Sequence, residues 1–336
     1  MIHASKYHLF SVFWLCVACV LNASAESPQD WLERMVAANG KYSYQGTLVH
    51  LCEGKMDVVH IVHRVNGGQV TERMTAAAAG GRQIIRNADE VMCILPDQRK
   101  VTVERHDPAA SPIGAQIANF PSFANISLSL YEVSMLAPDR VAERDTVTLA
   151  ILPVDAHRYG YRLWLDRQTA LPLKFELIDD KGQGLEQGMF TQIEYQESIA
   201  AQEVEPTIAT DGFEWQRSSV TSGDNAGRAS GAASGGPEKS RWRAADLPPG
   251  FELTFAQSQL ADESSDPMEQ LVYSDGLATI SVFIESNVDE SAALEGVSQI
   301  ASTNAFTTYR DGYLITAMGG VPLDTARMVA LSVSVR

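Results

Sequence analysis

The pattern of apolar and polar residues is most regular between residues 157 and 195, where it predicts three consecutive antiparallel strands. Apolar side chains take every second position, and this period gives a sheet one apolar and one polar face. Because one face is apolar, helices, a partner or a ligand must cover it. The alternating apolar residues of the first two strands are Tyr159, Tyr161, Leu163, Leu165, Leu171, Leu173, Phe175 and Leu177.

A short amphipathic helix and six further strands are predicted before this stretch. The helix is predicted at residues 28–39. Ser27, just before it, is a suitable helix cap, and Trp31 and Met35 lie on one apolar side. The connections between the six strands are too short for parallel crossovers, so the strands form an antiparallel meander. The predicted strands cover residues 42–51, 56–64, 69–74, 82–86, 91–95 and 100–105.

Residues 108–137 form an apolar stretch that Pro112, Gly114 and Pro121 interrupt. It is either a lid over the apolar face of the sheet or a set of ordinary core residues from short helices. One or two helical turns are predicted at residues 129–136. Residues 140–152 are predicted to form another strand pair, which pairs with the opening segment of the chain. If the stretch is a lid, the apolar face is one wall of a cavity. The expected lining residues are Trp31, Tyr161, Leu163, Phe175, Phe120 and Phe123.

The second half of the chain contains a change of composition that predicts two domains. Residues 218–240 are dominated by Gly, Ser and Ala without apolar periodicity, which is typical of a flexible linker. We place the first domain at residues 26–206, the linker at 207–243 and a small α+β domain at 244–336. In the small domain, strands are predicted at residues 252–258, 269–274, 278–285, 304–310 and 313–318, and a helix at 323–333.

The first 25 residues are predicted to be a secretory signal peptide. Basic residues precede an apolar run, and cleavage after Ala25 fits the small-x-small rule. A retained membrane anchor is the alternative, although the run is shorter than the roughly 20 residues that a span requires. The mature protein is therefore expected outside the cytoplasm.

The charge of the mature chain excludes one class of partner. The chain has 42 acidic and 26 basic residues, and Lys6 leaves with the leader, so the net charge is 25 minus 42, or −17. Nucleic acid is a poor partner for such a protein because its phosphates are repelled. Residues 26–120 are nearly balanced, with 11 acids and 10 bases, whereas residues 241–336 have 13 acids and 5 bases. If the protein binds an anionic ligand, the first third is therefore where the local charge allows it.

Cys52 and Cys93 are the cysteines that remain after the leader is removed. Both are in step with the apolar positions of predicted strands. A disulfide between them is compatible with an oxidising compartment. The alternative is a pair of buried thiols that fill space in the core.

No motif in the chain predicts catalysis, a resident metal or a cofactor. His60 and His63 form an HxxH pair, but residues three apart on a strand face opposite sides and cannot share an ion. The chain lacks the HExxH, Walker, dinucleotide-binding and GxSxG patterns. Binding is therefore favoured over chemistry.

Two groups of side chains are candidates for binding. The first meander is rich in arginine, and a cluster of Arg64, Arg73 and Arg86 would suit phosphate or carboxylate groups. Trp164 and Phe190 fall on the polar side of the three regular strands, where an aromatic is either covered by long charged neighbours or a contact residue.

Several short segments, in order along the mature chain, resemble the sigma-E factor regulatory protein family, known as RseB or MucB. No single segment is decisive, but their order is specific. The Gly/Ser-rich linker is longer than is typical of the family. The segments are Asp30-Trp31-Leu32, Tyr44-Gln45-Gly46-Thr47, His60-Ile61-Val62-His63-Arg64, His157-Arg158-Tyr159-Gly160, Leu165-Asp166-Arg167, Leu171-Pro172-Leu173-Lys174, Phe190-Thr191-Gln192, Leu247-Pro248-Pro249-Gly250-Phe251, residues 273–278 and residues 281–285.

The resemblance implies a periplasmic negative regulator. Its first domain would be an unclosed antiparallel β half-barrel, similar to lipoprotein carriers, with helices in the concavity. Its second domain would help to bind the periplasmic segment of a membrane-spanning anti-sigma factor and hinder the protease that cleaves it. Lipopolysaccharide or lipoprotein lipid would loosen this complex. A lipoprotein or lipid carrier is the alternative function, and a homodimer stays open. The candidate partner-binding residues are Tyr273, Phe283 and Glu285.

Overall fold

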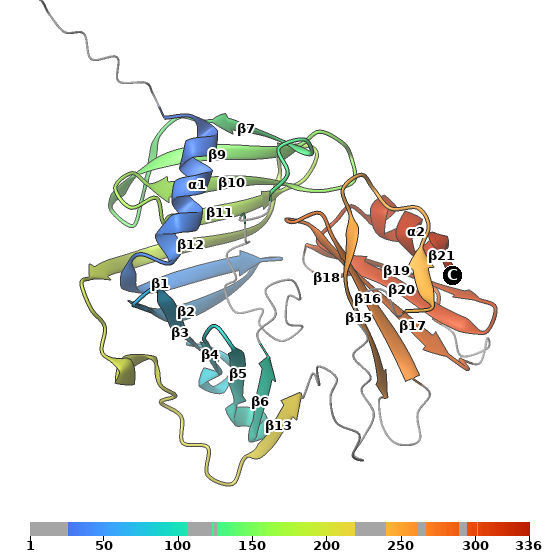
Figure 1. Ribbon diagram of the computed structural model, residues 1–336. Coiled ribbons are helices and arrows are strands. Elements are labelled where there is room, and N and C mark those ends of the chain that lie inside the picture. The colour runs from blue at the N-terminus through green and yellow to red at the C-terminus, as the bar shows by residue number, and fades with distance from the viewer. Residues whose placement is uncertain are drawn as a thin grey trace, which may run out of the picture.

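The computed structural model of the protein describes residues 26–105, 123, 126–218, 240–260, 267–288, 294–300 and 302–336. The predicted leader and the predicted linker residues 219–239 lie outside this part of the chain. The described residues form a large curved sheet with a helix against it and a smaller sheet with its own helix (Figure 1). None of the described helices is long and apolar enough to span a membrane.

Helix α1 (Pro28–Asn39) starts at the predicted cap. The Ser27 hydroxyl accepts a hydrogen bond from the Asp30 backbone N–H at 3.2 Å, and the Asp30 carboxylate accepts one from the Ser27 N–H at 2.8 Å. This reciprocal capping box fixes the first turn. The buried residues of α1 are Trp31, Leu32, Met35 and Ala38.

Within the described ranges, the large sheet has 13 strands, and its two outermost strands, β13 and β7, do not pair with each other to close a barrel. Twelve strands follow one another in the order β13-β6-β5-β4-β3-β2-β1-β12-β11-β10-β9-β7, and β8 pairs with β9. The predicted meander and the three regular strands are confirmed. The strands are β1 (Ser43–Cys52), β2 (Lys55–Asn66), β3 (Gln69–Ala76), β4 (Gln83–Arg86), β5 (Glu90–Leu95), β6 (Lys100–Arg105), β7 (Tyr131–Met135), β8 (Asp139–Val141), β9 (Arg144–Pro153), β10 (Gly160–Asp166), β11 (Pro172–Ile178), β12 (Gly184–Gln196) and β13 (Glu214–Ser218).

The two faces of the large sheet are covered by different parts of the chain. We call the face that α1 covers the helix face; Leu48, Leu163 and Phe175 point to it. The other, outer face of β2–β6 is covered by the segment that follows β12, including the short helix η3 (Ala201–Val204). This segment runs along the left of the sheet in Figure 1 and ends as β13, which pairs in parallel with β6.

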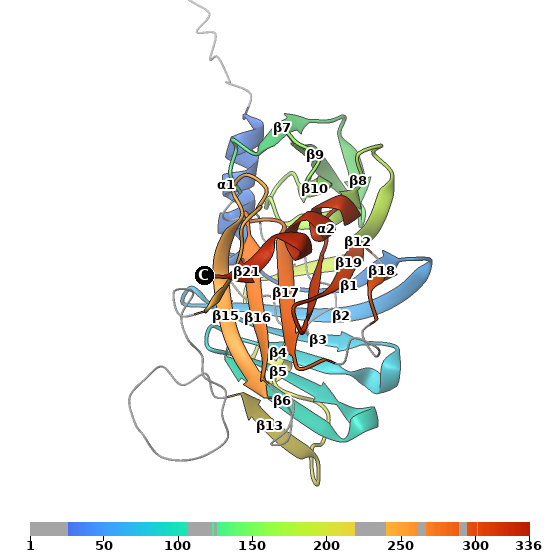
Figure 2. The same ribbon diagram turned by 90° about the vertical axis from the view of Figure 1, so that its right-hand side faces the viewer.

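The smaller sheet has the strand order β15-β16-β17-β20-β19-β18, and helix α2 (Leu323–Ser332) packs on β19 and β20. Both ribbon views place α2 on the side that points away from the large sheet (Figures 1 and 2). The short pair β14–β21 completes the domain. The strands are β14 (Trp242–Ala244), β15 (Glu252–Leu260), β16 (Pro267–Ser274), β17 (Thr279–Ser286), β18 (Gly296–Ile300), β19 (Thr303–Arg310), β20 (Tyr313–Gly319) and β21 (Val333–Val335).

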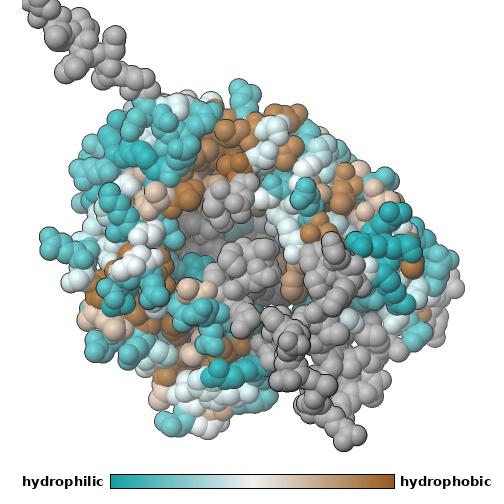
Figure 3. Space-filling view, viewed as in Figure 1, coloured by the Kyte–Doolittle hydropathy of each residue, from teal (hydrophilic) through white to brown (hydrophobic). Residues whose placement is uncertain are grey.

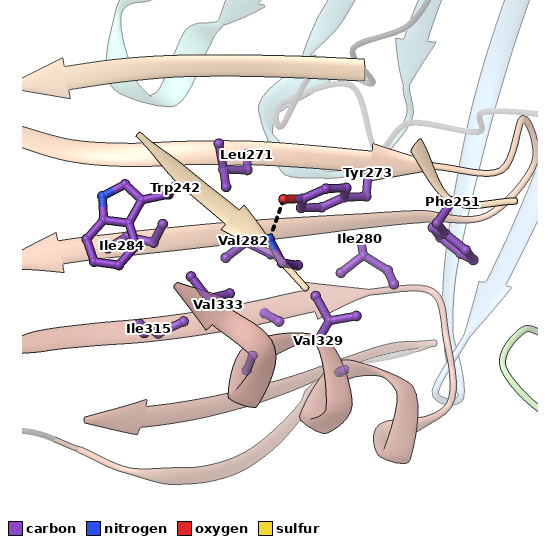
Figure 4. Close-up of a cluster of buried hydrophobic side chains, with 14 of the residues drawn as sticks. Trp242, Phe251, Leu271, Tyr273, Ile280, Val282, Ile284, Ile315, Val329 and Val333 are labelled. Carbon is purple, nitrogen blue, oxygen red and sulfur yellow. Dashed lines mark hydrogen bonds between the residues drawn. The ribbon is translucent and has the colours of Figure 1, made fainter. Parts of the chain in front are cut away.

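The core of the small domain lies between its sheet and α2 (Figure 4). Ile280, Val282 and Ile284 alternate along β17 and point to this core, as their two-residue spacing requires. Val329 and Val333 face them from α2 and β21. Trp242 of β14 covers one end of the core.

Three expectations differ from the structure. Residues 131–135 form strand β7 instead of helical turns, since the segment pairs with β9. Residues 296–300, which are not among the predicted strands, form β18. Strand β9 pairs with β10 and β7, and not with the opening segment.

Candidate functional site

The helix face carries a buried apolar cluster in which most of the predicted cavity residues meet. We call this cluster the apolar platform. Trp31, Leu163, Phe175 and Phe123 are all buried in it, whereas Tyr161 is partly buried at its edge, and Phe120 lies outside the described residues. The other buried members are Leu32, Met35, Tyr131, Val147, Leu149, Ile151, Leu165 and Ala170.

Helix α1 and Phe123 close the apolar platform from above the sheet. The Phe123 ring meets the Tyr161 ring edge to face, with 5.4 Å between their centroids. Burial raises the pKa of the Tyr161 hydroxyl, as expected for a phenol that has left water. The described residues that were predicted to line a cavity therefore form a packed core, and a hydrocarbon chain could enter between them if α1 moved.

The three candidate arginines do not form one anion site. Arg64 and Arg73 lie on the outer face, where their guanidinium groups donate to the backbone oxygens of Ile199 at 2.9 Å and Glu205 at 3.1 Å. Arg86 lies on the helix face and pairs with Glu72. Val62 lies opposite Arg73, and Arg64 is two residues after Val62, so Arg64 and Arg73 share one face of the sheet. Arg86 lies opposite Glu72 and is therefore on the other face.

Of the two alternatives left open for Cys52 and Cys93, the structure has the free thiols. Cys52 ends β1, and Cys93 lies in β5, with β2, β3 and β4 between them in the sheet. Neighbouring strands are about 4.8 Å apart, so the two Cα atoms are far beyond the reach of a disulfide, which is at most about 7 Å. The alternation correctly predicts a shared face, but it says nothing of the lateral distance.

The candidate partner-binding residues divide between core and surface. Tyr273 is buried, and its hydroxyl accepts a hydrogen bond from the Ala244 backbone N–H at 2.8 Å (Figure 4), so it cannot contact a partner. Phe283 and Glu285 lie on the opposite face of β17, half-buried and exposed respectively. That open face of the small sheet points toward the large domain (Figures 1 and 2).

The two domains meet at a buried ion pair between Arg158 and Asp275. Both side chains are 0% exposed, and the Asp275 carboxylate also accepts a hydrogen bond from the Tyr131 hydroxyl at 2.8 Å. Arg158 donates in addition to the Pro249 carbonyl at 2.7 Å and to Asp155 at 2.9 Å. Burial would lower the pKa of Arg158, but the bonds to Asp155 and the charge of Asp275 raise it.

Asp275 has a second role in the turn between β16 and β17. Its other carboxylate oxygen accepts hydrogen bonds from the backbone N–H groups of Leu277 at 2.8 Å and Ala278 at 2.6 Å. The side chain of Leu277 packs against the apolar platform of the large domain. One turn thus supplies both a charge and an apolar contact to the junction.

A second line of contacts joins the edge of the small sheet to β1 and β12. Glu186 accepts hydrogen bonds from His50 and from the Ser302 hydroxyl, both at 2.7 Å. Asn304 donates to the Tyr159 hydroxyl at 2.9 Å. The junction therefore extends from the β16–β17 turn to the start of β19, which fixes one domain relative to the other at more than one point.

Three of the segments that carry the family resemblance meet at this junction. They are His157-Arg158-Tyr159-Gly160, the turn Leu247-Pro248-Pro249-Gly250-Phe251 and residues 273–278. The resemblance singles out these segments, but not their contact. Nothing in the local pattern indicates that Arg158 pairs with an aspartate 117 positions away.

Comparison with known proteins finds the same two-domain family along the chain. Residues 27–208 match the MucB/RseB N-terminal domain, and residues 236–334 match the MucB/RseB C-terminal domain. The sigma factor AlgU regulatory protein MucB of Pseudomonas aeruginosa is 33% identical over 321 residues, which cover 92% of this chain and 91% of that protein. The sigma-E factor regulatory protein RseB of Escherichia coli K12 is 22% identical and covers 92% of this chain.

Solved structures support the same relationship. The Pseudomonas aeruginosa MucA/MucB complex contains a chain that is 31% identical to this one, with a TM-score of 0.71 and coverage of 92% of this chain and 99% of that chain. A crystal structure of MucB in complex with MucA(peri) matches with a TM-score of 0.69 and the same coverage. This chain therefore belongs to the MucB/RseB family of sigma factor regulatory proteins.

Proposed function

We propose that this protein is a periplasmic negative regulator that binds the periplasmic segment of a membrane-spanning anti-sigma factor and shields it from regulated proteolysis. The observation that carries the proposal is that both family domains are present in order and joined by a buried junction. Its solved relative MucB is seen in a complex with MucA. A junction with a fully buried ion pair holds the two domains together, so that both can contact the same partner.

The charge and the open face of the small domain support a peptide partner. Residues 241–336 carry 13 acids and 5 bases, which favours a basic segment by electrostatic steering. Phe283 and Glu285 lie on the open face of β17, and this combination of apolar and acidic side chains suits an amphipathic basic segment. Hydrophobic side chains also gather at the top of the large domain in Figure 3, near β7 and β9. Met135 and Leu152, which lie in these two strands, are exposed.

We further propose that the apolar platform senses an acyl chain of a mislocalised lipid or lipoprotein. Helix α1 contributes Trp31, Leu32 and Met35 to the cover of the platform, so displacement of this helix would open a site for hydrocarbon. The anionic headgroup would not be bound by a cluster of Arg64, Arg73 and Arg86, because these side chains already have partners on two faces.

Capture of the cognate anti-sigma periplasmic segment tests the regulator proposal. The mature protein should retain the segment and slow its cleavage by the periplasmic protease that initiates its degradation. A Phe283→Ala and Glu285→Lys variant should retain less of it, whereas an Asp246→Lys variant, a charge reversal of an exposed residue beside α2, should retain the wild-type amount. Failure of the wild-type protein to retain the segment would refute the proposal.

Lipid extraction separates the regulator from a simple carrier. A carrier would yield bound lipid and bind it without the small domain, whereas a regulator should release the captured segment when lipopolysaccharide or a lipoprotein is added. If added lipid neither binds nor releases the segment, the lipid-sensing proposal is wrong even though the regulator proposal stands.

A further inference from the structure

His63 is a fully buried histidine whose two ring nitrogens both face acceptors. It lies in β2 and is 0% exposed. Nδ1 is 2.5 Å from a Glu72 carboxylate oxygen, and Nε2 is 2.8 Å from the backbone oxygen of Asn39, the last residue of α1. The ring stacks on Tyr44, with 4.7 Å between the ring centroids.

Neither of these two acceptors can donate a hydrogen. A backbone carbonyl only accepts, and a carboxylate only accepts while it is ionised. Burial would raise the pKa of Glu72, but the charge of Arg86 and the hydrogen bond from His63 lower it to about 2. Glu72 is therefore ionised at neutral pH, and each nitrogen of His63 needs its own hydrogen to make its bond.

We propose that His63 is an imidazolium in the folded protein and that its Nε2–H fastens the end of α1 to the large sheet. The contact is favourable on two counts, since the last carbonyls of a helix lack partners within it and the helix C-terminus carries partial negative charge. His60, the other member of the HxxH pair, is exposed, and its ring forms a hydrogen bond with the Thr47 hydroxyl. The two histidines therefore have different roles.

The charged groups around His63 indicate which contact depends on its proton. Glu72 on β3 and Arg86 on β4 form an ion pair with each other, and Tyr44 on β1 stacks on the ring. When His63 gives one proton to solvent, the remaining hydrogen stays on Nδ1 because it faces the carboxylate. Nε2 then turns a lone pair toward the Asn39 oxygen. Deprotonation thus removes the bond to α1 and leaves Glu72 and Arg86 paired.

This contact would make the cover of the apolar platform depend on pH. The same helix buries Trp31, Leu32 and Met35 in the platform. The Nε2–H bond exists only while the ring carries both hydrogens, so α1 should be held more firmly in the imidazolium form. The consequence for lipid entry rests on the proposed function, whereas the protonation and the release of α1 do not.

Nitrogen NMR of the histidine rings in the mature protein tests the protonation directly. At pH 6, both ring nitrogens of His63 should carry hydrogen, and Nε2 should lose its hydrogen as the pH rises to 9. Over the same range, the protection of α1 amides against exchange should fall by about fivefold after correction for intrinsic rates, the factor expected for loss of one hydrogen bond. The His63→Gln variant should lose this pH dependence, and the His60→Gln variant should keep it.

Three results would overturn the inference. One is a His63 ring with a single N–H at every pH from 5 to 9. Another is deprotonation without any change in α1 exchange, and the third is loss of the pH dependence in the His60→Gln variant. The first two use the wild-type protein, so they stand even if the His63→Gln variant fails to fold. Capture of the anti-sigma segment is scored separately, so its failure would refute the proposed function and leave the His63 measurement intact.

Discussion

The buried acids of this protein are each surrounded by donors. Asp166 is 1% exposed, and its carboxylate accepts hydrogen bonds from Arg144, from the Tyr195 hydroxyl at 2.9 Å and from the Gln168 backbone N–H at 2.7 Å. Burial would raise its pKa, but these bonds lower it. Glu72 and Asp275 are satisfied in similar ways. Such groups are buried at little cost only while their partners are present.

Glu72 should make the protein sensitive to acid. Its pKa is lowered from 4.5 to about 2, so its contribution is complete above pH 4.5 and is lost as the pH falls toward 2. The lost free energy of unfolding is on the order of 3 kcal/mol. Denaturant unfolding of the mature protein across this range should show the decrease. The decrease in the free energy of unfolding should be smaller in the Glu72→Gln variant than in the wild-type protein. In the Glu33→Gln variant, where the replaced side chain is exposed, the decrease should equal that of the wild-type protein.

Residue patterns correctly predict the surroundings of some side chains and miss others. Trp164 is covered by the Lys174 ammonium, 4.0 Å above its ring, as expected for an aromatic on a polar face. Phe190 is 2% exposed on the helix face, and its predicted position on the polar face is wrong. The register of β12 shifts opposite Thr47 and Leu48, so the two-residue period is broken there.

At the scale of elements, two glycines make room for aromatic rings on the helix face. A Cβ on Gly46 would lie 2.7 Å from the Gln192 carbonyl oxygen and 2.8 Å from a Phe190 ring carbon. A Cβ on Gly188 would lie 2.3 Å from a Phe175 ring carbon. The bulky rings therefore pack directly on the backbone of β1 and β12, the two strands at the centre of the sheet.

The Gly46→Ala variant should be destabilised by about 1–3 kcal/mol, because its Cβ meets a backbone oxygen that cannot turn away. Gly40→Ala is a matched control, since Gly40 has φ of −89° and nothing within 4 Å of the position of its Cβ. Its free energy of unfolding should change by no more than about 0.5 kcal/mol. Equal effects in the two variants would contradict the packing of Phe190 on Gly46.

The separation of Cys52 and Cys93 by three strands predicts two free thiols in the mature protein. After unfolding without reductant, a thiol reagent should label both cysteines, and reductant should not increase the labelling. A protein that takes up label only after reduction would show that the bridge forms. Strand patterns alone left this question open, because they determine the face of a residue and not the order of strands in a sheet.

At the scale of the whole molecule, the two-domain organisation follows from the sequence, whereas the junction does not. The composition of residues 218–240 separates the domains, and the alternation predicts most strands on both sides. The large sheet continues beyond the boundary predicted at residue 206, because β13 adds residues up to Ser218 to it. The sequence did not reveal this strand, since β13 pairs in parallel with β6 and no tight turn joins the two strands. The pairing of Arg158 with Asp275 depends on how the finished domains meet.

Removal of the Arg158 side chain should loosen the junction. In an Arg158→Met variant, Asp275 would stay buried without its cation, at a cost of about 3–5 kcal/mol. Small-angle scattering should show a larger radius of gyration, and thermal unfolding should separate into two transitions. Arg162→Met is the control, since Arg162 lies nearby on β10 in a partly exposed pair with Glu176. A compact Arg158→Met protein with one transition would contradict this role.

The central position of β1 has a consequence for how the protein is made. Strand β1 lies between β2 and β12, and Thr47 is opposite Gln192, which is 145 positions later in the chain. Contacts so distant in sequence slow folding, because a long loop must close first. Strand β1 therefore cannot pair with β12 until the chain has been synthesised to residue 196. A chain that stops before β12 would expose an open strand edge and the apolar platform together, and aggregation should precede any regulatory activity.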